Sequence, residues 1–152
     1  MYLNTHTYYS LRYGTIAPKE LVSILLQQNV NSVCLTDINS TSSNLEFVRL
    51  AIKNAIKPIL GVDFRNKAQQ QFIMLAKNNE GYESINNYLS EFLHIKDFVI
   101  PDSAKKIKNT FVIYPFENDV HELKENEFIG VKPTDLNQLK FSKWRNKQDK
   151  LV

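Results

Sequence analysis

Three side chains with metal-binding chemistry follow short apolar runs in this sequence of 152 residues. His6 lies in LNTHTYYSL, Asp37 in LTDIN and Asp63 in ILGVDF. A neutral imidazole and two ionised carboxylates all donate lone pairs to a divalent cation. We therefore consider a metal site built from these three residues, provided that the fold brings the ends of three strands to one mouth.

Each of these residues also has a purely structural interpretation. Asp37 could cap a turn or the next helix, and His6 could be a hydrogen-bonded loop histidine. Asp63 could pair with Arg65 or with a lysine. Spacing along the chain does not decide between these interpretations and a metal site.

The elements that must position these residues follow from the apolar pattern. Short apolar runs bounded by turn residues predict six strands, over 2–5, 32–35, 58–64, 72–76, 111–114 and 128–131. Leu151 and Val152 could begin another strand. The polar segment 96–109, which carries a lysine run and a proline, is the clearest loop.

Four helices are expected between or after these strands. Apolar spacing and start signals place them from Pro18 to about residue 29, from Ser43 through Ala55, from about 80 to 94, and across Leu136 and Leu139. Ser43 and Glu46 have the spacing of a capping box, and Thr134 is the expected cap of the last helix.

The alternation of strands and helices predicts an α/β fold with βαβ units and a mostly parallel sheet. An open doubly wound sheet and a barrel both fit this pattern. In either one, functional residues collect at the carboxyl ends of the strands. His6, Asp37 and Asp63 occupy such positions in the predicted elements.

Composition limits the class of protein. The length suits one domain, 1–152, and 43% of the residues are hydrophobic, with a net charge of +3. No apolar run approaches eighteen residues and no signal peptide is visible, which favours a cytoplasmic protein without membrane contact. Cys34 is the single cysteine and is expected in the core. The basic segment 140–150 is interpreted as a solvated face rather than a DNA contact.

The segments LNTHTYYSL, LTDIN, IKPILGVDF and FIMLAKNNEGYESIN resemble the N-terminal PHP (polymerase and histidinol phosphatase) domain of bacterial DNA polymerase III alpha subunits. The later segment NEFIGVKPTDLNQL resembles the Bacteroidetes-type form of this domain. The resemblance implies a distorted (β/α)7 barrel with a metal cluster at its carboxyl-terminal rim. The present chain would hold an incomplete barrel from a much longer polymerase.

The ligand pattern that the resemblance implies is incomplete here. Four positions that carry ligands in the family are Asn4, Tyr13, Ile38 and Gln71, and the family glutamate is Asp63. A neutral amide, an aliphatic side chain and a phenol with a pKa of about 10 are poor ligands for a cluster of dications. The resemblance therefore leaves His6, Asp37 and Asp63 as remnant ligands of low occupancy, with no catalytic residue.

Three functional hypotheses remain. The first is a structural and interaction scaffold within a DNA-directed DNA polymerase, whose nucleotidyl transfer and magnesium belong to domains outside this segment. Its partners would be the rest of the polymerase chain, an exonuclease or other replisome subunits, and DNA through the parent. The second is a metal-dependent phosphoesterase or proofreading 3'-5' exonuclease. The third is an interaction domain unrelated to replication. No cofactor is expected beyond one weakly held zinc or manganese ion.

Overall fold

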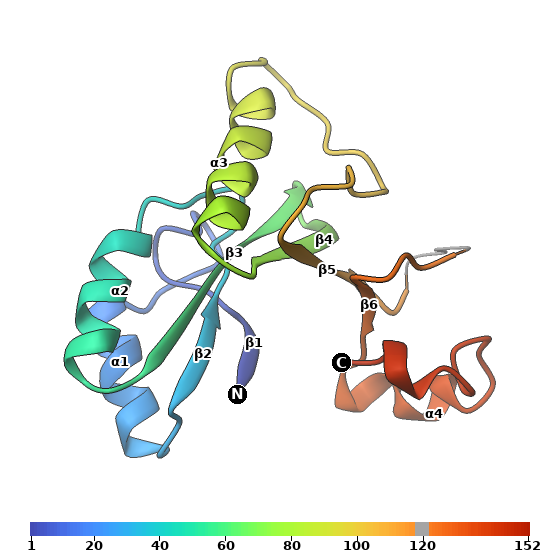
Figure 1. Ribbon diagram of the computed structural model, residues 1–152, viewed down its shortest axis with the longest axis horizontal. Coiled ribbons are helices and arrows are strands. Elements are labelled where there is room, and N and C mark those ends of the chain that lie inside the picture. The colour runs from blue at the N-terminus through green and yellow to red at the C-terminus, as the bar shows by residue number, and fades with distance from the viewer. Residues whose placement is uncertain (118–121) are drawn as a thin grey trace.

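The computed structural model describes residues 1–117 and 122–152 and shows a mixed α/β fold (Figure 1). Its strands are β1 (Tyr2–Thr5), β2 (Ser32–Leu35), β3 (Lys57–Asn66), β4 (Gln69–Ala76), β5 (Thr110–Pro115) and β6 (Glu127–Gly130). Its helices are α1 (Pro18–Gln27), α2 (Asn44–Lys53), α3 (Asn79–Leu93) and the short α4 (Leu136–Leu139), with 3-10 turns at Pro133–Asp135 and Gln148–Lys150.

Within the described residues, the strands form one curled sheet in the order β1-β2-β3-β4-β5-β6 (Figure 1). β1, β2 and β3 run parallel to one another, and β5 runs parallel to β6. Both pairings of β4 are antiparallel, so the sheet is parallel in three of its five described pairings, in agreement with the predicted mostly parallel sheet, and antiparallel in its middle. Only Lys67 and Ala68 separate β3 from β4, and Lys67 has a φ of 55°, so the chain turns back as a hairpin and cannot cross over.

Helices α1, α2 and α3 cover one face of the sheet. α1 and α2 pack on Val33 and Leu35 of β2, while α3 packs on the aromatic side chains of β3 and β4, including Phe64 and Phe72. α3 begins after Asn78, whose side chain accepts a hydrogen bond from the Gly81 N–H, as a helix cap does. The covered face therefore contains most of the hydrophobic core.

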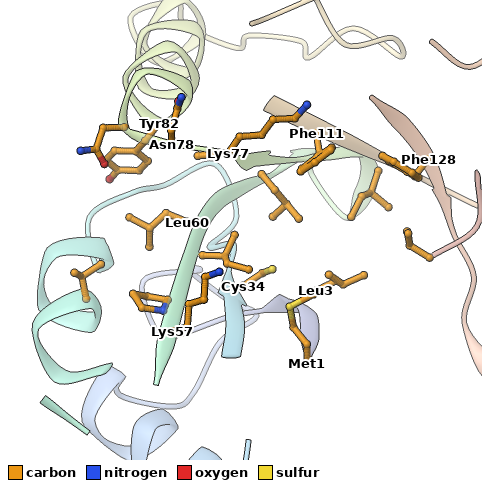
Figure 2. A pocket seen from close by; sticks show the side chains of 18 residues that line it. Met1, Leu3, Cys34, Lys57, Leu60, Lys77, Asn78, Tyr82, Phe111 and Phe128 are labelled. Carbon is orange, nitrogen blue, oxygen red and sulfur yellow. The ribbon is translucent and has the colours of Figure 1, made fainter. Parts of the chain in front are cut away.

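The opposite face of the sheet is apolar and open. Cys34, Ile73, Leu75 and Ile113 form a buried cluster there, as expected for Cys34. Burial raises the pKa of the Cys34 thiol to about 11. A groove of about 740 Å³ lies over this cluster. Phe111 and Phe128 line one side of the groove (Figure 2). The curled sheet thus has a concave side that helices do not fill in the part of the chain described here.

Of the two predicted helix caps, one has the right position and the other is wrong. Ser43 is the N-cap residue of α2, as predicted, but its side chain makes no capping hydrogen bond and donates instead to Asp37. α2 ends at Lys53, and Ala55 has a left-handed backbone with a φ of 57°. Thr134 lies inside a 3-10 turn, and α4 spans only four residues. The positions of α1 and α3 and the loop between α3 and β5 agree with the predictions.

The end of the chain returns to the sheet. Leu151 forms an isolated parallel bridge with Ile129 of β6, as expected for the beginning of a strand. Trp144 is 3% exposed and belongs to the same core cluster as the buried side chains of α3. Of the helices in the two described segments, none is both long enough and apolar enough to cross a membrane.

Candidate functional site

The predicted site residues lie at one edge of the sheet. Because β1, β2 and β3 are parallel, their carboxyl ends meet there. His6 directly follows β1, Asp37 follows β2 after one intervening residue, and Asp63 lies within β3. The Asp63 N–H donates a hydrogen bond to the Asp37 carbonyl oxygen at 3.3 Å. The backbones therefore come together as the sequence predicts.

The side chains of Asp37 and Asp63, however, leave the sheet on opposite faces. Residues paired across neighbouring strands share a face. The register that pairs Leu35 with Leu60 continues to a bridge between Ile38 and Asp63. Asp63 thus shares a face with Ile38, and Asp37, one residue earlier, faces the side that the helices cover.

Asp37 is fully buried and accepts hydrogen bonds from four donors. The Thr7 N–H and hydroxyl donate at 2.6 and 2.7 Å, the Ser10 hydroxyl donates at 2.7 Å, and the Ser43 hydroxyl donates as well. Ser10 in turn accepts from the Ile38 N–H at 2.9 Å. Both carboxylate oxygens of Asp37 therefore tie the loop after β1 to the start of α2.

Asp63 is equally buried but is bound by charged and imidazole donors. One oxygen, Oδ2, accepts from Arg65 Nη2 at 2.7 Å and Arg65 Nε at 3.0 Å. The same oxygen lies 3.1 Å from His6 Nε2 and 3.5 Å from Asn4 Nδ2. A carboxylate can only accept hydrogen bonds, so this contact is a hydrogen bond in the tautomer that carries its proton on Nε2.

The pKa of Asp63 reflects these partners. Burial by itself would raise it, but hydrogen bonds from His6 and Arg65, the nearby Gln70 amide and the charge of Arg65 outweigh burial, and the pKa lies below its ordinary value. Among the buried polar atoms described, Asp63 Oδ1 and Gln70 Nε2 both lack a direct partner within hydrogen-bond distance. The first is an acceptor and the second a donor, so they complement each other.

The residues that stand at the family's ligand positions have other structural roles. Asn4 accepts a hydrogen bond from the Thr36 hydroxyl at 2.7 Å. The Tyr13 hydroxyl donates to the Lys67 carbonyl oxygen at 3.2 Å. Gln71 is 2% exposed and lies within β4. None of these contacts requires a metal ion.

The donor set does not fit a cluster of metal ions. His6 and Asp63 meet, whereas Asp37 lies on the other face of the sheet, so the three do not share a mouth. Residues 1–117 and 122–152 contain no group of three or more His, Cys, Asp or Glu side chains that is placed to hold a metal ion. Binding of a single weak ion by His6 and Asp63 stays a prediction.

The sequence contained a signal for this separation. Every second residue of a strand faces the same side, so Asp37 shares a face with Val33 and Leu35, and Asp63 shares a face with Ile59. Ile59 pairs with Cys34, which faces the side opposite to Leu35. The two acids therefore face opposite sides of the sheet. Sequence reasoning missed the three hydroxyl donors to Asp37. It considered Arg65 only as an alternative partner of Asp63.

Comparison with known proteins identifies the family. A family model described as PHP domain matches residues 3–128, and the chain belongs to this family. The DNA polymerase III subunit alpha of Ureaplasma parvum is 32% identical over 100 residues, which are 66% of this chain and 10% of that protein. The same subunit of Staphylococcus aureus is 28% identical over 116 residues, or 74% of this chain and 11% of that one. The aligned part is thus about a tenth of these relatives.

A solved structure gives a weaker likeness. It is a protein of Bifidobacterium adolescentis whose name gives a provisional assignment as a metal-dependent phosphoesterase. The TM-score is 0.42 at 20% identity, over 61% of this chain and 34% of that one. The assignment to the PHP family therefore depends on the sequence comparisons.

Proposed function

We propose that this chain is the PHP domain of a longer polymerase of the DNA polymerase III alpha type and acts there as a structural scaffold. Its membership in the PHP family and its similarity to two alpha subunits support this proposal. Nucleotidyl transfer, its magnesium ions and the main DNA contacts belong to other parts of the parent polymerase, which works in the cytoplasm.

The observation that carries the scaffold role is the state of Asp63. Hydrolysis of a phosphoester by a metal cluster requires carboxylates and imidazoles that are free to bind the ions. Here Asp63 binds Arg65 and His6, and Asp37 binds hydroxyl groups on the other face. The rim is therefore organised by hydrogen bonds, and we infer that it does not activate water.

The open sheet face supports an interaction role. Large contiguous apolar surfaces on soluble domains mark binding sites for other protein surfaces. The groove in Figure 2 is lined by Leu3, Ile59, Leu75 and Phe128, among others. We propose that the remainder of the polymerase chain covers this groove, and that an exonuclease or another replisome subunit contacts the assembled domain.

A hydrolysis assay tests the absence of activity. The purified chain is incubated with p-nitrophenyl phosphate or with single-stranded DNA in the presence of Mn²⁺ or Zn²⁺. We expect no turnover above that of the His6→Ala variant. Metal-dependent turnover that His6→Ala abolishes would instead establish the phosphoesterase or 3'-5' exonuclease function.

The reading frame tests the relation to a polymerase. We expect the coding sequence to continue past Val152 into a polymerase catalytic region. A stop codon directly after Val152 would contradict a role inside a longer polymerase, whatever the hydrolysis assay shows.

A further inference from the structure

The side chain of Arg65 lies at the centre of the Asp63 site. Only 16% of this side chain is exposed, and two of its nitrogens donate to Asp63 Oδ2. The guanidinium carbon lies 5.4 Å from the centre of the Tyr13 ring, in a cation-π contact. The positive guanidinium of Arg65 is therefore bound to the Asp63 carboxylate, which stands at a metal-ligand position of the family pattern.

The backbone of Arg65 is also held in place. The Asn39 side chain accepts a hydrogen bond from the Arg65 N–H at 3.0 Å and donates one to the Arg65 carbonyl oxygen at 2.9 Å. The register of β3 against β4 shifts between Phe64 and Arg65, which fixes the local direction of the strand. The Arg65 side chain therefore extends from a backbone that is held in place, and its guanidinium group stays at Asp63 rather than in solvent.

We propose that Arg65 is the resident cation of this rim: as long as its guanidinium binds Asp63, divalent metal ions do not bind there at micromolar concentration. This inference builds on the proposed scaffold function, because it explains how the rim remains ordered without a metal. A guanidinium binds carboxylate with fixed geometry and keeps its charge at every pH at which the protein folds.

Two obstacles oppose a divalent ion at this position. An ion bound to Asp63 Oδ2 would have to displace two charge-assisted hydrogen bonds from Arg65. An ion bound to the unpartnered Oδ1 of the same carboxylate would still lie near the positive guanidinium. Removal of Arg65 relieves both obstacles while leaving His6 and Asp63 in place.

The test is a metal titration of the full chain and of Arg65→Met, followed by calorimetry and by thermal unfolding. For the natural chain we expect no binding of Zn²⁺ or Mn²⁺ at micromolar concentration and no change in melting temperature. For Arg65→Met we expect a lower melting temperature without metal, at least tenfold tighter Zn²⁺ binding than in the natural chain, and a rise in melting temperature when Zn²⁺ is added.

Two further variants assign the effect to the site. The double variant Arg65→Met with His6→Ala should lose the response to Zn²⁺. Arg49→Met removes an exposed arginine on α2 and should behave like the natural chain in every measurement. If Arg65→Met does not fold, Arg65→Gln, which keeps a hydrogen-bond donor without the charge, takes its place in the same titrations.

The natural chain alone can overturn the proposal. Micromolar Zn²⁺ or Mn²⁺ binding that disappears in His6→Ala would show that Arg65 does not exclude the metal. A folded Arg65→Met or Arg65→Gln with unchanged metal affinity would show the same. These outcomes are independent of turnover, so metal binding without hydrolysis would overturn this inference and leave the scaffold function intact.

Discussion

Asp37 and Asp63 lie at the ends of adjacent strands, and both are completely buried, yet the protein stabilises their charges in different ways. Asp37 accepts hydrogen bonds from one N–H and three hydroxyl groups, and no cation among the described residues pairs with it. Asp63 has a guanidinium and an imidazole as partners. The difference shows that one step of strand register decides whether an acid joins the covered core or the open rim.

The two arrangements also connect different parts of the molecule. Asp37 joins the loop after β1 to the start of α2 through Thr7, Ser10 and Ser43. Asp63 joins the end of β1 to the β3–β4 hairpin through His6 and Arg65. We therefore expect Asp37 to matter mainly for folding stability, and Asp63 to give stability that depends on pH.

The largest effect is expected for Asp37→Ala. Loss of the carboxylate leaves four buried donors without an acceptor, which should lower the free energy of unfolding by about 3–5 kcal/mol. Urea denaturation followed by circular dichroism measures this change. Asp149→Ala, at an exposed position near the end of the chain, is the matched control and should change stability by less than about 0.5 kcal/mol. A loss below about 1 kcal/mol for Asp37→Ala would remove the distinction between the two acids.

An intermediate effect is expected for Asp63→Asn, with a defined pH dependence. The variant leaves Arg65 without its anion and should lose about 2–3 kcal/mol near pH 7. The pKa of Asp63 is lowered in the folded state, so its stabilising contribution is complete above the ordinary pKa of about 3.9 and is lost as the pH falls through the lower folded value.

Urea denaturation from pH 2 to pH 7 measures this contribution as the difference between the natural chain and Asp63→Asn. We expect a constant difference above about pH 5 and a smaller one as the pH falls below about 4. The other titrating groups are the same in both proteins, so their contributions cancel in the difference between the two free energies of unfolding. A difference that grows toward low pH would contradict the ionised pairing of Asp63 with Arg65.

The smallest effect is expected for His6→Gln. The His6 side chain is 21% exposed, and Arg65 still binds Asp63 in this variant, so the loss should be about 1 kcal/mol or less. Thermal unfolding at pH 7 measures it. A loss as large as that of Asp63→Asn would mean that the imidazole, rather than the guanidinium, is the main partner of Asp63.

Local sequence signals predicted the elements that depend on a few neighbouring residues. Pro18 starts α1, because proline suits the first turn of a helix through its own covalent structure. The capping role assigned to Ser43 failed because a buried carboxylate competes for its hydroxyl group. That carboxylate belongs to Asp37, six residues before Ser43, and Thr7 and Ser10 from the loop after β1 bind it as well.

The candidate site was only partly accessible to the same reasoning. The short runs ending near His6, Asp37 and Asp63 placed all three residues at one edge of the sheet. The face on which each side chain projects depends on how neighbouring strands are aligned, and this alignment cannot be read from the sequence of one strand alone. The departures at Asn4 and Tyr13 indicated an incomplete metal site, but they did not identify a replacement for the metal.

The alternation of strands and helices, the family and the residue types available at the rim could all be inferred from the amino-acid sequence, because they follow from local patterns. The partners of the two acids, hydroxyl groups for Asp37 and Arg65 for Asp63, became known from the folded chain. Side chains alternate between the faces of a sheet, so the alignment of neighbouring strands, and not distance along the chain, selects these partners.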